Sequence, residues 1–125
     1  QIACLAMIET PEGIENVEEI VTTPGLTGVY IGPSDLALAL GLPAYGDQPQ
    51  EEHLETVKHI LATCKKHGVV SGMHTSSLEY TKKYLELGFN MVMLGSDSAF
   101  MMRTASKELA EAKGSVEENK ESTGY

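Results

Sequence analysis

The feature that most constrains this sequence is an alternation of short apolar runs with segments of helical periodicity. Four runs are typical of β-strands, at residues 2–8, 28–31, 69–73 and 91–94. They are almost continuously apolar, as strands buried on both faces are, and helical patterns separate them. The order β-α-β-α-β-α-β-α predicts parallel strands that are joined by right-handed crossovers.

Local signals mark the ends of the intervening helices. Thr10 is a good N-cap, and Pro11 suits the first helical position. Glycine ends three of the helical patterns, at Gly41, Gly68 and Gly88. The expected helices cover residues 10–23, 35–40, 49–67, 78–87 (capped by Ser76 or Ser77) and 98–113. In the longest one, Leu54, Val57, Leu61 and Cys64 are expected to face inward, and His53, His59 and His67 to lie at the surface.

Two architectures contain such a repeat: an open flavodoxin-like sheet and a (β/α)₈ barrel. A whole barrel takes about 250 residues, or about 30 for each βα unit. Four units fall within residues 1–113, and no G-x-G-x-x-G or G-x-x-x-x-G-K motif follows a strand. We therefore expect α/β structure with parallel strands, four βα units that form half of a TIM barrel. Residues 114–125 are expected to be a polar, disordered tail.

Composition excludes several classes of function. The chain has 125 residues and a net charge of −9, and its nine basic residues are scattered, which argues against a nucleic-acid surface. No apolar stretch approaches the roughly 20 residues that span a membrane, and no signal peptide is evident. Cys4 and Cys64 lack the spacing of a zinc site or a disulfide, so we expect two buried thiols in a reducing cytoplasm. The sequence begins inside an apolar run, which suggests a piece of a longer protein.

The ends of the predicted strands carry the polar residues of interest. Glu9 follows the first strand, Asp35 the second, His74 the third and Asp97 the fourth. Neighbouring parallel strands end at one edge, so Glu9 and Asp35 should lie close together. Two interpretations are open: the pair binds a hard divalent cation such as Mg²⁺ or Mn²⁺, or each acid caps the helix that follows it.

The turn Gly32-Pro33-Ser34-Asp35 adds a second function to this edge. Gly32 would let a ligand approach the backbone, and Pro33 would stiffen the turn. The amides of Ser34 and Asp35 would then face outward at a helix N-terminus, which suits a carboxylate.

Two longer motifs give the sequence a specific resemblance. "MIETPEGIENVEEI" and "PGLTGVYIGPSDLALALG" place Glu9 and Asp35 26 residues apart, and "HGVVSGMHT" and "LGFNMVMLGSD" follow in order. Over residues 1 to about 112 the chain resembles the metal-dependent 4-hydroxy-2-oxoheptanedioate and 2-dehydro-3-deoxyglucarate aldolases. These are relatives of citrate lyase β subunits in the phosphoenolpyruvate/pyruvate barrel superfamily. The resemblance corresponds to the C-terminal half of that barrel, strands five to eight.

The resemblance implies class II aldol chemistry, the reversible cleavage of a 4-hydroxy-2-oxo acid to pyruvate and an aldehyde through a metal-stabilised enolate. Glu9 and Asp35 would hold Mg²⁺ or Mn²⁺, with Co²⁺ as a further option. Gly32, Ser34 and Asp35 would bind the substrate carboxylate. No lysine ends a strand, which argues against a Schiff-base aldolase.

The chain departs from the family pattern at Met7, where members often carry glutamine. The family's catalytic histidine and arginine come from the other half of the barrel, so the fragment alone is expected to be inactive. His74 is a candidate for substrate contact or acid–base catalysis, and the alternative is a hydrogen-bonded rim residue. Arg103 is expected at a surface or interface, and Asp97 as a helix cap.

Partners and rival functions follow from the same features. The apolar residues 100–102 would be exposed unless another subunit covers them, in line with a homo-oligomer (a hexamer in full-length family members). One alternative is a relative of the citryl- or malyl-CoA lyases, which the acidic charge weakly opposes. Another is a catalytically silent half-barrel that assembles through its sheet edges or binds anions.

Overall fold

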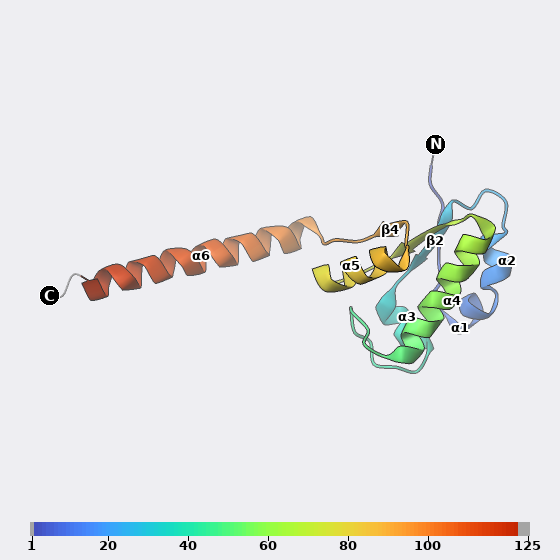
Figure 1. Ribbon diagram of the computed structural model, residues 1–125, viewed down its shortest axis with the longest axis horizontal. Coiled ribbons are helices and arrows are strands. Elements are labelled where there is room, and N and C mark those ends of the chain that lie inside the picture. Colours follow the sequence, from blue (N-terminus) through green and yellow to red (C-terminus); the bar gives the residue numbers. More distant parts are fainter. Residues whose placement is uncertain (1, 123–125) are drawn as a thin grey trace. The chain divides into compact units, whose positions relative to one another are not determined.

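The computed structural model (Figure 1) describes the backbone of residues 2–122 and the side chains up to residue 114. The chain divides into two units, Gln1–Leu94 and Gly95–Tyr125. All the strands and helices α1 to α5 belong to the first unit, and helix α6 forms the second. Among the described residues, no helix combines the length and apolar character needed to cross a membrane.

The first unit is built on one parallel sheet. Its strands are β1 (Leu5–Met7), β2 (Gly28–Ile31), β3 (Val70–Met73) and β4 (Met91–Val92), and they lie side by side in that order. Every neighbouring pair is parallel. The predicted α/β class with four parallel strands is confirmed. The strand at β2 has the predicted bounds, while β1 and β4 are shorter than the apolar runs that contain them.

The helices alternate with these strands as the sequence predicts. They are α1 (Pro11–Glu15), α2 (Val17–Val21), α3 (Pro33–Ala39), α4 (Glu51–His67), α5 (Leu78–Leu87) and α6 (Asp97–Ser122). The predicted N-caps are present at Thr10 and Ser77, whose side chains accept from backbone amides three residues ahead. Gly68 and Gly88 end α4 and α5 with φ of +66° and +97°, in the left-handed region that glycine reaches without strain.

The first predicted helix is divided in two at Asn16. The backbone of Asn16 leaves the helical region (φ −101°, ψ 16°), and its side-chain amide donates to the carbonyl of Glu12 at 2.8 Å. An asparagine side chain competes in this way with the backbone for helical acceptors. Apolar periodicity alone did not predict this break, because Ile14 and Val17 stay on one face across it.

Helix α6 runs past the position where the sequence predicts its end. The pattern indicates a helix to Lys113 followed by a disordered tail, whereas α6 continues to Ser122. A single glycine at position 114 costs a helix only about 1 kcal/mol, so it need not end one. Residues 123–125 lie outside the described residues.

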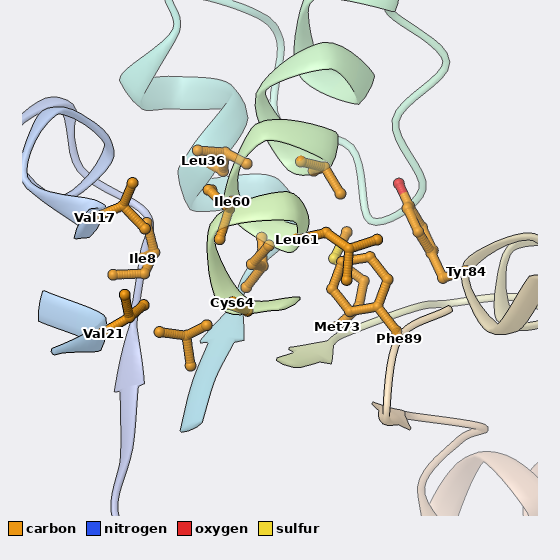
Figure 2. Close-up of a cluster of buried hydrophobic side chains, with 13 residues drawn as sticks. Ile8, Val17, Val21, Leu36, Ile60, Leu61, Cys64, Met73, Tyr84 and Phe89 are labelled. Carbon is orange, nitrogen blue, oxygen red and sulfur yellow. The ribbon is translucent and has the colours of Figure 1, made fainter. Parts of the chain in front are cut away.

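The core lies on one face of the sheet, where the helices pack (Figure 2). Ile8, Ile31 and Met73 from the strand side are fully buried, and side chains of α2, α3, α4 and α5 point toward them. Helices α2 and α4 are neighbours in this layer (Figure 1). The inward positions predicted for α4 are confirmed at Val57, Leu61 and Cys64, and Leu54 is partly buried against the same cluster.

The opposite face of the sheet is uncovered in the described chain. Its side chains alternate with those of the core, and several are apolar and exposed: Leu5, Met7, Val70 and Met91, at 36 to 55% of their surface. This exposure differs from the prediction of strands buried on both faces. Cys4 is also exposed rather than buried, because it precedes an edge strand that pairs only with β2.

Candidate metal and substrate site

Strand register brings three sequence-predicted residues to one edge of the sheet. Met7 pairs with Tyr30, and Tyr30 pairs with Gly72. The pairing continues beyond the strands, since Ile8 donates to the carbonyl of Tyr30 and His74 to that of Ile31. Side chains alternate along a strand, so the next row on the uncovered face consists of Glu9, Gly32 and His74. The predicted gathering at the carboxyl ends is therefore present.

Neither acid is an N-cap. Thr10 caps α1 through its hydroxyl, which accepts from the amide of Gly13 at 3.1 Å, and Glu9 precedes that cap. The N-cap of α3 is Gly32, which leaves Asp35 in the first helical turn. Asp35 is favourably placed near the positive end of that helix, but the capping interpretation fails for both residues.

Gly32 separates the two carboxylates. A methyl group built on Gly32 would lie 2.5 Å from Glu9 Oε2 and 3.6 Å from Asp35 Oδ2. The two oxygens are therefore at most about 6 Å apart. The backbone of Gly32 (φ −90°, ψ 109°) suits any residue, so the space that the Glu9 carboxylate occupies, rather than the conformation, requires glycine here.

The Glu9 carboxylate is in an unfavourable environment for a charge without a counter-ion. Its Oε2 atom is buried and receives no hydrogen bond within the described part of the chain. Burial raises the pKa of Glu9, and the nearby negative charge of Asp35 raises it further. An orphaned carboxylate oxygen beside a second carboxylate fits a hard divalent cation, which takes oxygen ligands.

A hollow of about 220 Å³ opens next to this pair. It is lined by Met7, Tyr30, Gly32, Pro33, Ser34, Asp35 and His74. Among the residues whose side chains are described, no group of three or more Asp, Glu, His or Cys side chains forms a metal cluster. A cation here would thus take its remaining ligands from water or from a bound small molecule.

His74 and Tyr30 form one wall of the hollow. The Tyr30 hydroxyl lies 3.3 Å from His74 Nδ1, and the two rings meet edge to face. Burial raises the pKa of Tyr30, which keeps its hydroxyl neutral. Tyr30 was not among the predicted site residues. Tyr30 lies two residues before Gly32, and residues two apart in an extended chain lie on the same face. This spacing could have indicated Tyr30.

Ser34 lines the hollow, but its hydroxyl forms a hydrogen bond within the chain. Its hydroxyl donates to the carbonyl of Tyr45 at 3.1 Å, which ties α3 to the segment that precedes α4. Gln48 donates to the carbonyls of Pro43 and Tyr45 and so holds the same segment. Any role of Ser34 toward a ligand would therefore rest on its backbone amide.

The prediction that His53 lies at the surface is wrong. His53 is fully buried, and its Nε2 lies 3.1 Å from the carbonyl oxygen of Pro33. The spacing of His53, Val57, Ile60 and Cys64 on one helix face was the signal that it belongs to the buried stripe. His59 is exposed as predicted, and His67 is partly exposed and contacts Glu18 at 2.6 Å.

In the second unit, the prediction for Arg103 agrees with the structure of α6 and the prediction for Asp97 is wrong. Asp97, predicted as the cap, is instead the first residue of the helix, and its carboxylate accepts from the adjacent amide of Ser98 at 2.7 Å. The capping position is that of Ser96, whose hydroxyl accepts from the amide of Ala99 at 3.2 Å. Arg103 is exposed and lies over the ring of Phe100. Phe100, Met101 and Met102 are exposed by 43 to 68%.

The fold defines a portion of a βα-barrel protein, with the candidate site at the carboxyl ends of the strands. Residues 1–104 match the HpcH/HpaI aldolase/citrate lyase family. The chain belongs to this family, and it has the α/β structure of a partial barrel of that type.

Similar proteins define how much of such a barrel is present. A 5-keto-4-deoxy-D-glucarate aldolase of Klebsiella pneumoniae is 40% identical over 111 residues, which are 89% of this chain and 42% of that protein. A solved family member from Burkholderia cenocepacia covers 90% of this chain at a TM-score of 0.82 and 28% identity, over 43% of its own length. The chain therefore spans about two fifths of these relatives.

A more distant structure has the same fold. The citrate lyase β subunit of M. tuberculosis, solved with oxaloacetate and magnesium, covers 74% of this chain at a TM-score of 0.61 and 18% identity, over 47% of its own length.

Proposed function

We propose that residues 1–113 form the C-terminal half of a metal-dependent pyruvate aldolase barrel and carry its metal ligands. The reaction of the complete enzyme would be the reversible cleavage of a 4-hydroxy-2-oxo acid to pyruvate and an aldehyde. The observation that supports this most is the buried, unpartnered Oε2 of Glu9, which faces Gly32 beside Asp35. The similarity to 5-keto-4-deoxy-D-glucarate aldolases favours the same class of reaction.

Glu9 and Asp35 would hold Mg²⁺ or Mn²⁺, with Co²⁺ as a further option. When bound, such an ion supplies the positive charge that stabilises the negative charge left on the 2-oxo acid after carbon–carbon cleavage. The chain's own contribution is to keep two carboxylates close together, where burial and the charge of Asp35 raise the pKa of Glu9.

The substrate would bind in the hollow beside the two acids. Gly32 leaves room for it, and the first-turn amides of Ser34 and Asp35 have no partner within the helix and would donate to its carboxylate. His74 would contact the substrate from the opposite wall or exchange a proton with it, oriented by the Tyr30 hydroxyl. Met7 also lines the hollow, at a position where family members often carry glutamine, and it would make the hollow less polar.

Activity would need more structure than this chain contains. It spans 42% of its aldolase relative, and an apolar face of its sheet is uncovered. We propose that further barrel structure covers that face, that the complete enzyme is a homo-oligomer and that it acts in the cytoplasm. The chain alone would bind the metal ion and pyruvate without cleaving substrate.

Two other functions make different predictions. A relative of the citryl- or malyl-CoA lyases would use the same acids, and the fold shared with a citrate lyase β subunit supports that alternative. Binding of a CoA thioester in preference to a free 2-oxo acid would identify it. A silent half-barrel would self-associate through its sheet without any dependence on divalent metal.

The test is calorimetric titration of Mn²⁺ and Mg²⁺ into the chain, with and without pyruvate. The double variant Glu9→Gln, Asp35→Asn should abolish binding. The variant Glu12→Gln, Glu15→Gln is the matched control, since it removes the same charge from exposed positions on α1. Saturable binding that pyruvate strengthens and only the first variant removes would support the proposal. Equal loss in both variants, or no binding by a folded chain, would contradict it.

A further inference from the structure

We propose that His53 is a positioning residue that fixes the turn carrying Gly32 and Asp35 relative to Glu9. The inference rests on the proposed metal site and adds to it a residue from α4, a helix that contributes no side chain to the hollow. Its basis is the contact between His53 Nε2 and the carbonyl oxygen of Pro33, at 3.1 Å.

The contact fixes the chemistry of the imidazole. A carbonyl oxygen only accepts, so Nε2 must carry the hydrogen and donate it. The other ring nitrogen, Nδ1, is buried and has no hydrogen-bond partner in the described residues. A second proton on the ring would have nowhere to bond. Burial lowers the pKa of His53 against the opposing effect of the hydrogen bond to Pro33, and the charge of Lys83 lowers it further. His53 is therefore a neutral, single donor.

The orphaned nitrogen separates a positioning role from a packing role. An unpartnered polar atom in a fully buried side chain costs roughly 1–3 kcal/mol. An apolar side chain of similar size would fill the same space between α4 and α3 without that cost. Packing of α4 alone thus does not account for a histidine at this position, whereas a directed hydrogen bond to the turn does.

Core packing of Leu36 and Ala37 holds α3 against the sheet, but few side-chain hydrogen bonds hold the turn itself. Helix α3 has only seven residues, and Gly32 caps it without a side-chain hydrogen bond. Among the described side chains, two hydrogen bonds hold this turn: those of Ser34 to Tyr45 and of His53 to Pro33. Pro33 lies between Gly32 and the first-turn amides, so a bond to its carbonyl fixes the turn where it passes Glu9. Removing that bond would let Asp35 move relative to Glu9.

Mn²⁺ binding to the whole chain tests this, followed by the loss of the electron paramagnetic resonance signal of the free ion. His53→Leu removes the donor, and His53→Gln keeps an amide donor. Cys64→Ala is the control, because Cys64 is equally buried on α4 and lies away from the turn. If the leucine variant does not fold, His53→Met replaces it, because methionine adapts to irregular space. The Mn²⁺ affinities of the variants are compared under conditions in which the same fraction of each protein is folded.

The expected result is a Kd for Mn²⁺ raised about tenfold or more by His53→Leu, in the range for groups that orient metal ligands. Cys64→Ala should stay within about twofold, and His53→Gln should recover most of the affinity. Amide hydrogen exchange without metal is a second measurement. The amide of Leu36 donates to the carbonyl of Gly32 at 3.0 Å, and it should exchange faster in His53→Leu than in Cys64→Ala.

The outcomes separate this inference from the function on which it rests. If the unsubstituted chain is folded and binds no Mn²⁺, the proposed metal site fails, and the inference fails with it. If the chain binds Mn²⁺ but His53→Leu binds equally well, only the inference is overturned. The inference is likewise overturned if glutamine recovers no affinity, or if Leu36 exchange matches that of the Cys64 control.

Discussion

Replacement of Gly32 by alanine tests the candidate site at its narrowest point. The new methyl group would lie 2.5 Å from Glu9 Oε2, whereas ordinary van der Waals contacts of a Cβ atom begin near 3.4 Å. The oxygen must therefore move by roughly 0.5 to 1 Å. Since it is the end of a flexible side chain, Glu9 can rotate away without distorting the sheet.

The effects on stability and on binding should differ. The backbone of Gly32 is already in a region open to alanine, so the fold loses little, and a stiffer unfolded chain adds about 0.4–1 kcal/mol of stability. Metal–ligand distances tolerate only about 0.2 Å, so the same shift should weaken Mn²⁺ binding tenfold to a hundredfold, or about 1.4–2.8 kcal/mol.

Calorimetric titration of Mn²⁺ measures the binding effect, and a urea unfolding curve measures the stability. Gly114→Ala is the control, because a methyl group there meets nothing within 4 Å. Unchanged Mn²⁺ binding in Gly32→Ala would show that the space at Gly32 is not needed by the carboxylate pair. A large loss of stability would show instead that the Glu9 side chain cannot move aside.

Three further predictions concern the fold. Cys4 should react with a thiol reagent in the native chain, and Cys64 only after unfolding, because burial raises the pKa of Cys64 to about 11; reaction of both thiols in the native state would contradict this. Gly68→Ala should lower the free energy of unfolding by about 1 kcal/mol, since its φ of +66° disfavours a side chain, and an unchanged urea midpoint would count against that reason. The pKa of His53 is lowered by burial and by Lys83, so the unfolded chain binds a proton at higher pH than the folded chain. The contribution of His53 to the free energy of unfolding should be fully present above about pH 6.5 and should fall as the pH drops below that value. The fall should be shallower in His53→Gln, and an equal pH dependence of urea unfolding in the two proteins would exclude this contribution.

Local sequence patterns predicted the order of the elements and most of their ends. Thr10, Ser77, Gly68 and Gly88 act through atoms a few residues away, so their roles as helix caps are readable in the chain. The polar residues after each apolar run likewise predicted that Glu9, Asp35 and His74 would meet at one edge, because parallel strands leave no other arrangement.

Which of these groups are buried, and what they contact, depends on how the elements pack together. His53 contacts Pro33, which is 20 positions away in the sequence, and Tyr30 contacts His74, which is 44 positions away. A local pattern does not specify such pairs, and His53 was therefore misassigned to the surface. The same holds for Glu9, whose carboxylate is orphaned by the packing around Gly32 and not by its neighbours in sequence. Short-range hydrogen bonds fix where elements begin and end, whereas burial and charge depend on elements that the fold brings together.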